Sequence, residues 1–268
     1  MDERRRLHHC ARVVHDHLLA EGFLRVRMTL EGAPASHLVM CYRNQLPAIF
    51  VECYRNGQPV IVLTPRARQR LLAFAADAGA IPCTAALDLC GGDLRAVNTP
   101  TEIAPRNGFE TVLRTTELLT EVTRGRPWRI ADCDLDAAIE MTDWELHDFG
   151  VQVVRTKFER EGHTILYYNT DLDRDPQVWV ARHGRRTACL VRTVRFPTPD
   201  AAFPYEEGRR ILDLAARHEA DALFCSVSVA SMDDAFDKIH ITPLYRGRGM
   251  VVRYQGPQDI HALIGTRA

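Results

Sequence analysis

The chain carries one pattern twice, and this repeat constrains its fold more than any other feature of the sequence. When the 268 residues are shifted by 140 positions, the two halves align without a gap. The segment RLLAFAADAGA from Arg70 then lies opposite RILDLAARHEA from Arg210, and further identities are spread along the alignment: Val13 with Val153, Gly22 with Gly162, Ala48 with Ala188, and Val51 with Val191. Because the order of segments and the loop lengths are preserved as well, we interpret the repeat as a duplicated domain.

Each half predicts a helix, three strands, a second helix and a further strand. Apolar residues at helical spacing indicate the helices, and Thr64 followed by Pro65 is typical of a helix start. In the first half we expect helices at 3–21 and 64–79 and strands at 23–32, 37–44, 48–57 and 81–89. In the second half we expect helices at 143–162 and 204–220, strands at 163–170, 176–184, 186–196, 221–231 and 249–256, and a short helical end at 257–265.

The strands on either side of the second helix are almost continuously apolar in both halves. Strands of this kind are buried on both faces, so they belong in a sheet covered by helices, with parallel pairing across the helical crossover. The sequence therefore predicts an α/β fold in each half.

The segment between the halves is rich in Gly, Pro and Asn and then becomes amphipathic from 109 to 125. We expect a first domain at 1–92, a linker with a helix at 93–140, and a second domain at 141–268. The alternative is one continuous domain.

Composition gives no global attraction to nucleic acid or to an anionic membrane, because the formal net charge is -1 and the pI is about 6.8. The eight cysteines include no C-x-x-C pair, so they are expected to be buried apolar residues in a reducing cytoplasm. The charged N-terminus does not suggest a signal peptide, and no segment approaches the ~20 apolar residues that a membrane span requires.

The element order resembles the core of the PD-(D/E)XK, or restriction-endonuclease-like, superfamily. The segment FVECYRNGQPVIVLTPRARQRLLAFAADAGAIPCTAALDL, at 50–89, is similar to archaeal-type Holliday junction resolvases. The resemblance implies two tandem restriction-endonuclease-like α-β-β-β-α-β domains and a pseudo-dimer within one chain. In the family, an Asp at the start of the second strand and a Glu on the third bind Mg²⁺, and a Lys two residues later assists catalysis.

Neither half retains these residues. In the first half Glu52 matches the strand carboxylate, but Tyr54 stands at the lysine position and no acid stands near 36–37. In the second half the equivalents of Glu52 and Tyr54 are Arg192 and Val194, and the Asp position reads Pro176-Gln177. The resemblance therefore predicts a catalytically degenerate protein without a cofactor, which acts as a nucleic-acid-binding or protein-interaction module.

Two alternatives remain open. The first is an active Mg²⁺-dependent nuclease with displaced catalytic residues, for which the candidates are Glu52, Asp175 and Glu145. Each also has a structural interpretation: a strand carboxylate paired with an Arg, a solvated turn, or an acid that favours a helix N-terminus. The second alternative is a structural subunit of a larger complex.

Four arginines are the candidate contacts to DNA or RNA phosphates: Arg192, Arg195, Arg246 and Arg248. Arg192 and Arg195 lie on opposite faces of one predicted strand, so one of them points toward the expected cleft. Either one has an alternative partner in Glu206 or Glu207. A protein partner also remains possible, and no membrane partner is expected.

Overall fold

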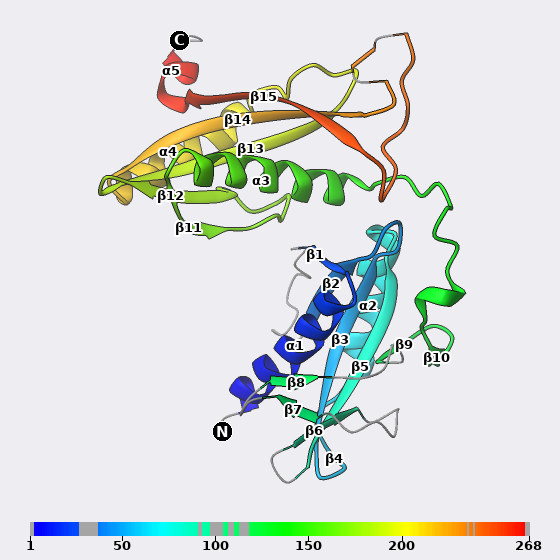
Figure 1. Ribbon diagram of the computed structural model, residues 1–268. Helices are drawn as coiled ribbons and strands as arrows, with labels where there is room; N and C mark the ends of the chain where they lie inside the picture. The colour runs from blue at the N-terminus through cyan, green and yellow to red at the C-terminus, as the bar shows by residue number, and fades with distance from the viewer. Residues whose placement is uncertain are drawn as a thin grey trace. The chain divides into compact units, whose positions relative to one another are not determined.

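The computed structural model of the protein describes residues 3–26, 37–90, 93–96, 104–106, 110–112, 118–234, 236–237 and 239–265. The chain divides into two compact units, 1–138 and 139–268 (Figure 1). Each unit is a mixed α/β structure built on its own main sheet.

The first unit has a sheet in the order β1-β2-β3-β5-β9-β10, in which only β3 and β5 are parallel neighbours. Helix α2 makes the crossover between these two strands, and α1 packs against β3 through a core that includes Cys10, Val14 and Val51. The elements are α1 (Glu3–Ala20), β1 (Leu24–Val26), β2 (His37–Cys41), β3 (Pro47–Arg55), β4 (Gln58–Ile61), α2 (Pro65–Asp77), β5 (Ile81–Cys90), β6 (Asp93–Ala96), β7 (Ala104–Arg106), β8 (Glu110–Val112), β9 (Leu119–Glu121), β10 (Arg126–Pro127) and a 3-10 helix, η1 (Ile130–Asp132).

The second unit has one sheet in the order β11-β12-β13-β14-β15, and β13 and β14 are its only parallel pair. Helix α3 covers one face through a core that includes Val154, Val191 and Val227, and α4 with α5 covers the other (Figure 1). The elements are α3 (Asp143–Arg160), β11 (Thr164–Tyr168), β12 (Val178–Arg182), β13 (Arg185–Arg195), α4 (Tyr205–Arg217), β14 (Ala220–Ser231), β15 (Met250–Asp259) and α5 (Ile260–Gly265).

The two units repeat one another in strand register as well as in element order. Helices α3 and α4 begin and end 140 positions after α1 and α2. In the antiparallel pairs, Leu38 lies opposite Ile49 and Val178 opposite Cys189, again 140 positions on. In the parallel pairs, residue 47 lies opposite 81 and residue 187 opposite 221, which preserves the same shift. The predicted α/β class is confirmed, and the 140-residue repeat is visible in the pairing of the strands.

The helix expected at 109–125 is wrong for the described part of that segment. Residues 110–112 and 119–121 are strands, and β9 pairs with the outer edge of β5 through Cys83 and Glu121. Leu118 and Leu119 are buried because this strand extends the sheet. Pairing with β5 therefore determines the structure here, although the apolar residues of the segment are spaced as in a helix. Residues 118–138 also belong to the first unit, where Trp128 joins the core.

The strand expected at 48–57 ends earlier than predicted. It stops at Arg55, because Asn56 and Gly57 both have positive φ, 49° and 77°, and turn the chain into β4. Asn-Gly is the preferred pair for a two-residue hairpin turn of this kind.

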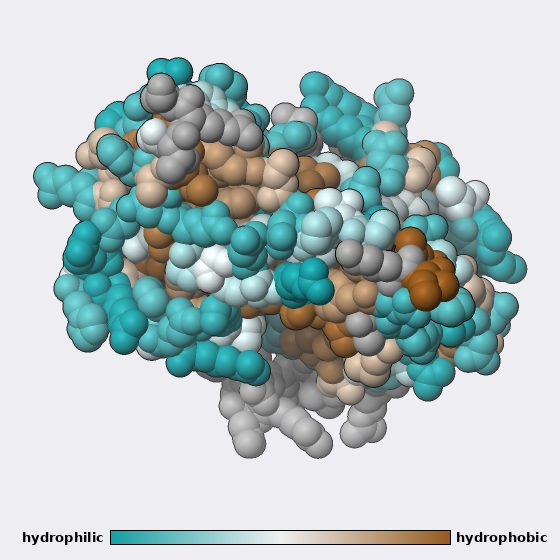
Figure 2. All heavy atoms as spheres, turned by 90° about the horizontal axis from the view of Figure 1, so that it is seen from above, coloured by the Kyte–Doolittle hydropathy of each residue, from teal (hydrophilic) through white to brown (hydrophobic). Residues whose placement is uncertain are grey.

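Several exposed apolar side chains lie in the second unit. Leu166 and Tyr167 of the edge strand β11 are 50% and 54% exposed, and Ile239, in the segment before β15, is 84% exposed. On the face that Figure 2 shows, hydrophobic residues lie among hydrophilic ones.

The first helix and third strand approach closely in both units, with different side chains at the contact. In the first unit the Sγ atoms of Cys10 and Cys53 are 3.4 Å apart. In the second unit the equivalent positions are Gly150 and Thr193, and a Cβ added to Gly150 would lie 1.9 Å from Thr193 Oγ1. The absence of a side chain at Gly150 therefore allows α3 to seat on β13.

We predict that Gly150→Ala destabilises the second unit by about 1–3 kcal/mol, because the new methyl group overpacks this contact. Elsewhere in a helix the same change usually stabilises by ~1 kcal/mol, so the sign is diagnostic. Urea unfolding followed by ¹⁹F NMR of 5-fluorotryptophan separates the units, since Trp144 and Trp179 report the second and Trp128 the first. Gly150→Ala with Thr193→Gly should recover part of the loss, and an unchanged or raised midpoint for Gly150→Ala would contradict the prediction.

Candidate functional site

An ion pair lies beside the C-terminal part of β13, which extends past the first residue of its neighbour β12. The first residue of β12, Val178, lies opposite Cys189, so Arg192 extends beyond this pairing toward the 169–177 turn. Arg192 Nη1 lies 3.0 Å from Asp175 Oδ1, and Nη2 lies 3.1 Å from Oδ2. The side chains are only 23% and 16% exposed. This bidentate geometry fixes the guanidinium and carboxylate in one plane.

Gln177 holds this ion pair in place. Its fully buried side chain donates from Nε2 to Asp175 Oδ1 at 2.6 Å and to the Arg174 carbonyl oxygen at 3.0 Å. Its Oε1 accepts the Val191 backbone N–H at 2.8 Å. A single amide thus joins the turn to the middle of β13 and restricts the carboxylate of Asp175.

His147 of α3 adds an uncharged imidazole near the same pair. It is 2% exposed, and its buried Nε2 has no hydrogen-bond partner among the described atoms. Burial lowers its pKa to about 4, and the positive charge of Arg192 contributes in the same direction against the opposing carboxylates of Asp175 and Asp171. The imidazole is therefore neutral at pH 7.

We predict that His147 makes the second unit acid-sensitive. Because the pKa is near 4 in the folded state and about 6.5 when unfolded, the unfolded chain binds more protons in between. The stabilisation is complete above pH 6.5 and is lost as the pH falls toward 4, by roughly 3 kcal/mol. His147→Gln should remove this part of the pH dependence in ¹⁹F-monitored urea unfolding, whereas His183→Asn, at an exposed histidine, should retain it. Equal pH profiles for His147→Gln and the unmodified chain would contradict the assignment.

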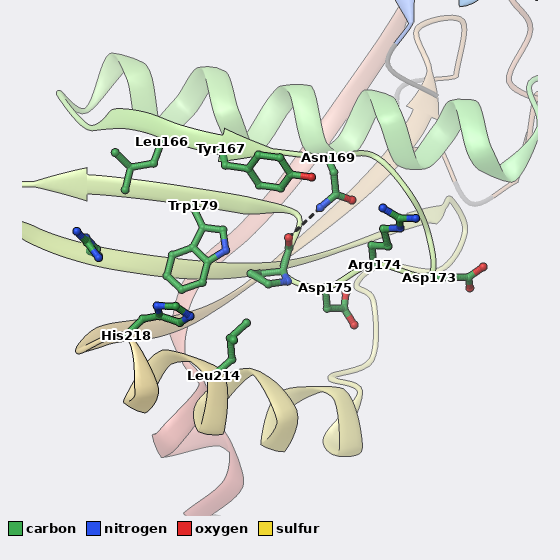
Figure 3. A pocket seen from close by; sticks show the side chains of 11 residues that line it. Leu166, Tyr167, Asn169, Asp173, Arg174, Asp175, Trp179, Leu214 and His218 are labelled. Carbon is green, nitrogen blue, oxygen red and sulfur yellow. Dashed lines mark hydrogen bonds between the residues drawn. The ribbon is translucent and has the colours of Figure 1, made fainter. Parts of the chain in front are cut away.

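A groove of about 790 Å³ adjoins Asp175 on the α4 side of the sheet (Figure 3). Tyr167 of β11 and Trp179 of β12 face it from one side, and Leu214 of α4 and His218 from the other. The Trp179 and His218 rings meet edge to face with centroids 5.6 Å apart. The recess is therefore largely apolar and aromatic, with charged groups along its margin.

Glu145 and Arg246, both sequence candidates, are buried together instead of lining the groove. Arg246 Nε and Nη2 donate to Glu145 Oε1 and Oε2 at 2.7 and 2.8 Å. Glu145 also accepts the Thr142 backbone N–H at 2.8 Å, which completes a capping box at the start of α3. The geometry gives both residues a structural role.

Arg195 and Arg248 occupy different environments. Arg195 donates to the Met141 carbonyl oxygen, and its guanidinium nitrogens lie 3.5 Å from Glu140 and 3.3 Å from Asp143. Arg248 is exposed, and its guanidinium lies 5.6 Å from the centre of the Tyr245 ring.

Glu206 and Glu207 of α4, the alternative partners considered for Arg192 and Arg195, do not pair with these arginines. Glu207 pairs with Arg210 at 3.1 Å, and the observed partner of Arg192 is Asp175. The acidic partner of Arg192 thus comes from the turn before β12 and not from α4.

Glu52 lies in the first unit, at the position equivalent to Arg192. Its Oε1 accepts the Leu63 backbone N–H at 2.8 Å. The pKa of the Tyr54 hydroxyl is raised by burial and then by the charge and hydrogen bond of Glu52. Within the described ranges, no three His, Cys, Asp or Glu side chains lie close enough together to hold a metal ion.

Sequence reasoning did not identify Gln177, His147 or the groove. For Trp179 a signal was present, because it alternates with Val178 and Val180 and must face the opposite side of the sheet. His147 lies near charged groups from distant parts of the chain, and Gln177 joins Asp175, two residues away, to Val191 on β13, so no pattern of local spacing marks either residue.

One family model matches part of the second unit. A family model described as a domain of unknown function, DUF8840, matches residues 144–260. This range runs from the start of α3 to the first residue of α5 and includes the Arg192–Asp175 pair and the groove. No curated protein and no solved structure matches the chain. None of the helices in the described residues has the length and apolar character needed to cross a membrane.

We predict that Arg246→Met destabilises the second unit by about 3–5 kcal/mol, because it leaves the Glu145 carboxylate buried without its partner. Arg248→Met is the matched control, two residues away and exposed, and should change stability by no more than about 0.5 kcal/mol. Midpoints of ¹⁹F-monitored urea unfolding compare the two. Similar midpoints for both variants would contradict a structural role for the buried pair.

Proposed function

We propose that the protein binds nucleic acid without cutting it, and that its two units are degenerate members of the PD-(D/E)XK, or restriction-endonuclease-like, fold. The support for the fold is the α-β-β-β-α-β order with matching strand register in both units. Because one fold hosts many functions, the functional proposal rests on the residues of the site.

The observation that carries the proposal is the bidentate Arg192–Asp175 pair. In a nuclease of this fold the third strand would supply a carboxylate, and two acids would converge on Mg²⁺. Here a guanidinium stands at the strand position and neutralises the remaining acid at 3.0 and 3.1 Å. A divalent cation would have to displace Arg192 from Asp175, and the positive charge of Arg192 opposes its entry.

Support for nucleic-acid binding comes from the margin of the adjoining groove. Arg174 and Arg186 both line it and both are exposed. Arginines at the rim of an aromatic recess attract phosphates, and such contacts produce binding that weakens as salt is added. This local arrangement does not depend on the near-zero net charge of the whole chain.

The test measures binding and cleavage with the same labelled substrates. The full chain is incubated with fluorescein-labelled single-stranded DNA, duplex DNA and RNA, each with Mg²⁺, with Mn²⁺ and with EDTA. We expect fluorescence anisotropy to show binding whose log affinity falls linearly with log salt, while denaturing gels show intact substrates.

Two outcomes would overturn the proposal. Metal-dependent cutting that Asp175→Asn abolishes and Asp173→Asn preserves would identify a live nuclease with displaced ligands; Asp173 is an exposed acid of the same turn. The absence of binding to every substrate at low salt would instead favour a protein partner or a structural subunit.

A further inference from the structure

We propose that the groove beside Asp175 holds one unpaired nucleobase of a single-stranded nucleic acid. This inference rests on the proposed function and specifies the substrate that the second unit recognises. It assigns the base to the aromatic recess and the flanking phosphates to the arginines at its margin.

The recess presents aromatic surfaces suited to stacking. Tyr167 is 54% exposed on the edge strand β11, and Trp179 lies between it and α4 (Figure 3). Contact of Trp179 with His218 is edge to face. The volume of about 790 Å³ lies within the ~300–1,000 Å³ range of small-ligand sites. An unpaired base has a free face that can stack on these rings, whereas a base paired and stacked in a duplex has no free face to offer.

Positive charge is placed where the sugar-phosphate chain would leave the recess. Arg186 is two residues before Ala188 on β13, and Ala188 lies directly opposite Trp179, so Arg186 is on the same face of the sheet as the indole. Arg174 lies in the turn at the Asp175 side; its side chain is 61% exposed and its Nε lies 3.1 Å from Asp171 Oδ2. An anionic strand that crosses the groove thus meets a guanidinium on β13 and another in the turn, together with the carboxylates of Asp173 and Asp175, of which Asp175 is neutralised by Arg192.

The first unit provides an internal comparison, because it lacks this set of residues. The positions equivalent to Trp179, Arg186 and His218 are Val39, Leu46 and Ala78. These three side chains are 3%, 1% and 1% exposed. At these three described positions, aliphatic core residues thus replace the ring, the cation and the rim histidine, so the shared scaffold alone does not specify this part of the recess.

The test compares a fluorescein-labelled 12-nucleotide oligothymidine with a hairpin duplex of similar length, using the full chain and anisotropy. We expect tighter binding to the single strand and a loss of roughly 5- to 150-fold on Tyr167→Ala, as for one stacked base. Tyr167→Phe retains the ring and should retain binding, and Leu24→Ala, on the edge strand of the first unit, is the control for loss of an exposed apolar side chain.

A second pair of variants tests the phosphate contact. Arg186→Gln should weaken binding and reduce the slope of log affinity against log salt by about one contact. Arg185→Gln is the matched control, because Arg185 is the preceding residue of β13 and pairs with Asp221 at 2.7 Å. Thymidine monophosphate is included as a competitor to distinguish a strand from a free nucleotide.

The outcomes separate this inference from the proposed function. Binding that is equal for duplex and single strand and unaffected by Tyr167→Ala would overturn the inference and leave nucleic-acid binding intact. Thymidine monophosphate affinity equal to that of the oligonucleotide would also overturn it, in favour of a free nucleotide. The absence of any nucleic-acid binding would overturn both.

Discussion

The parallel pairing of β13 with β14 is the constraint on which the second unit depends. These strands are buried on both faces, α3 covers one side, and α4 must cross the other to connect them. The β12 strand begins opposite Cys189, which leaves the last residues of β13 without that neighbour. The polar groups of the 169–177 turn fill this position, so the location of the candidate site follows directly from strand lengths and register.

The chemistry of the site follows from a reversal of charge at one strand position. Glu52 and Arg192 are equivalent in the repeat, and each has a partner within its own unit. Glu52 accepts the Leu63 N–H, and Arg192 donates to the Asp175 carboxylate. The two units thus share a backbone but present opposite charges at the same place. At the described positions equivalent to Trp179 and His218, the first unit has Val39 and Ala78, so these two rings of the recess are not repeated there.

Much of the scaffold was predictable, because the helix start and end signals, the apolar spacing and the repeat all indicated the same order of helices and strands. Thr64 with Pro65 at α2 illustrates a start signal that the structure uses, with Thr64 Oγ1 accepting the Ala67 N–H at 3.2 Å. The β9 strand was not predictable, since it forms only because β5 offers an open edge. The site was predictable in part: Asp175 and Arg192 were both candidates, but their pairing depends on the conformation of the 169–177 turn, which Gln177 fixes by joining Asp175 to the Val191 backbone on β13.

The seat of α3 on β13 limits how the two halves can diverge. In the first unit this contact is made by two thiols, and in the second unit a glycine of the helix faces a threonine of the strand. Both pairs allow the same close approach of the helix to the strand, but their members cannot be exchanged. Exchange of one member alone would create either a collision or a void. The helix position and the strand position are therefore coupled: a substitution at one of them keeps the helix seated only when the other changes to match.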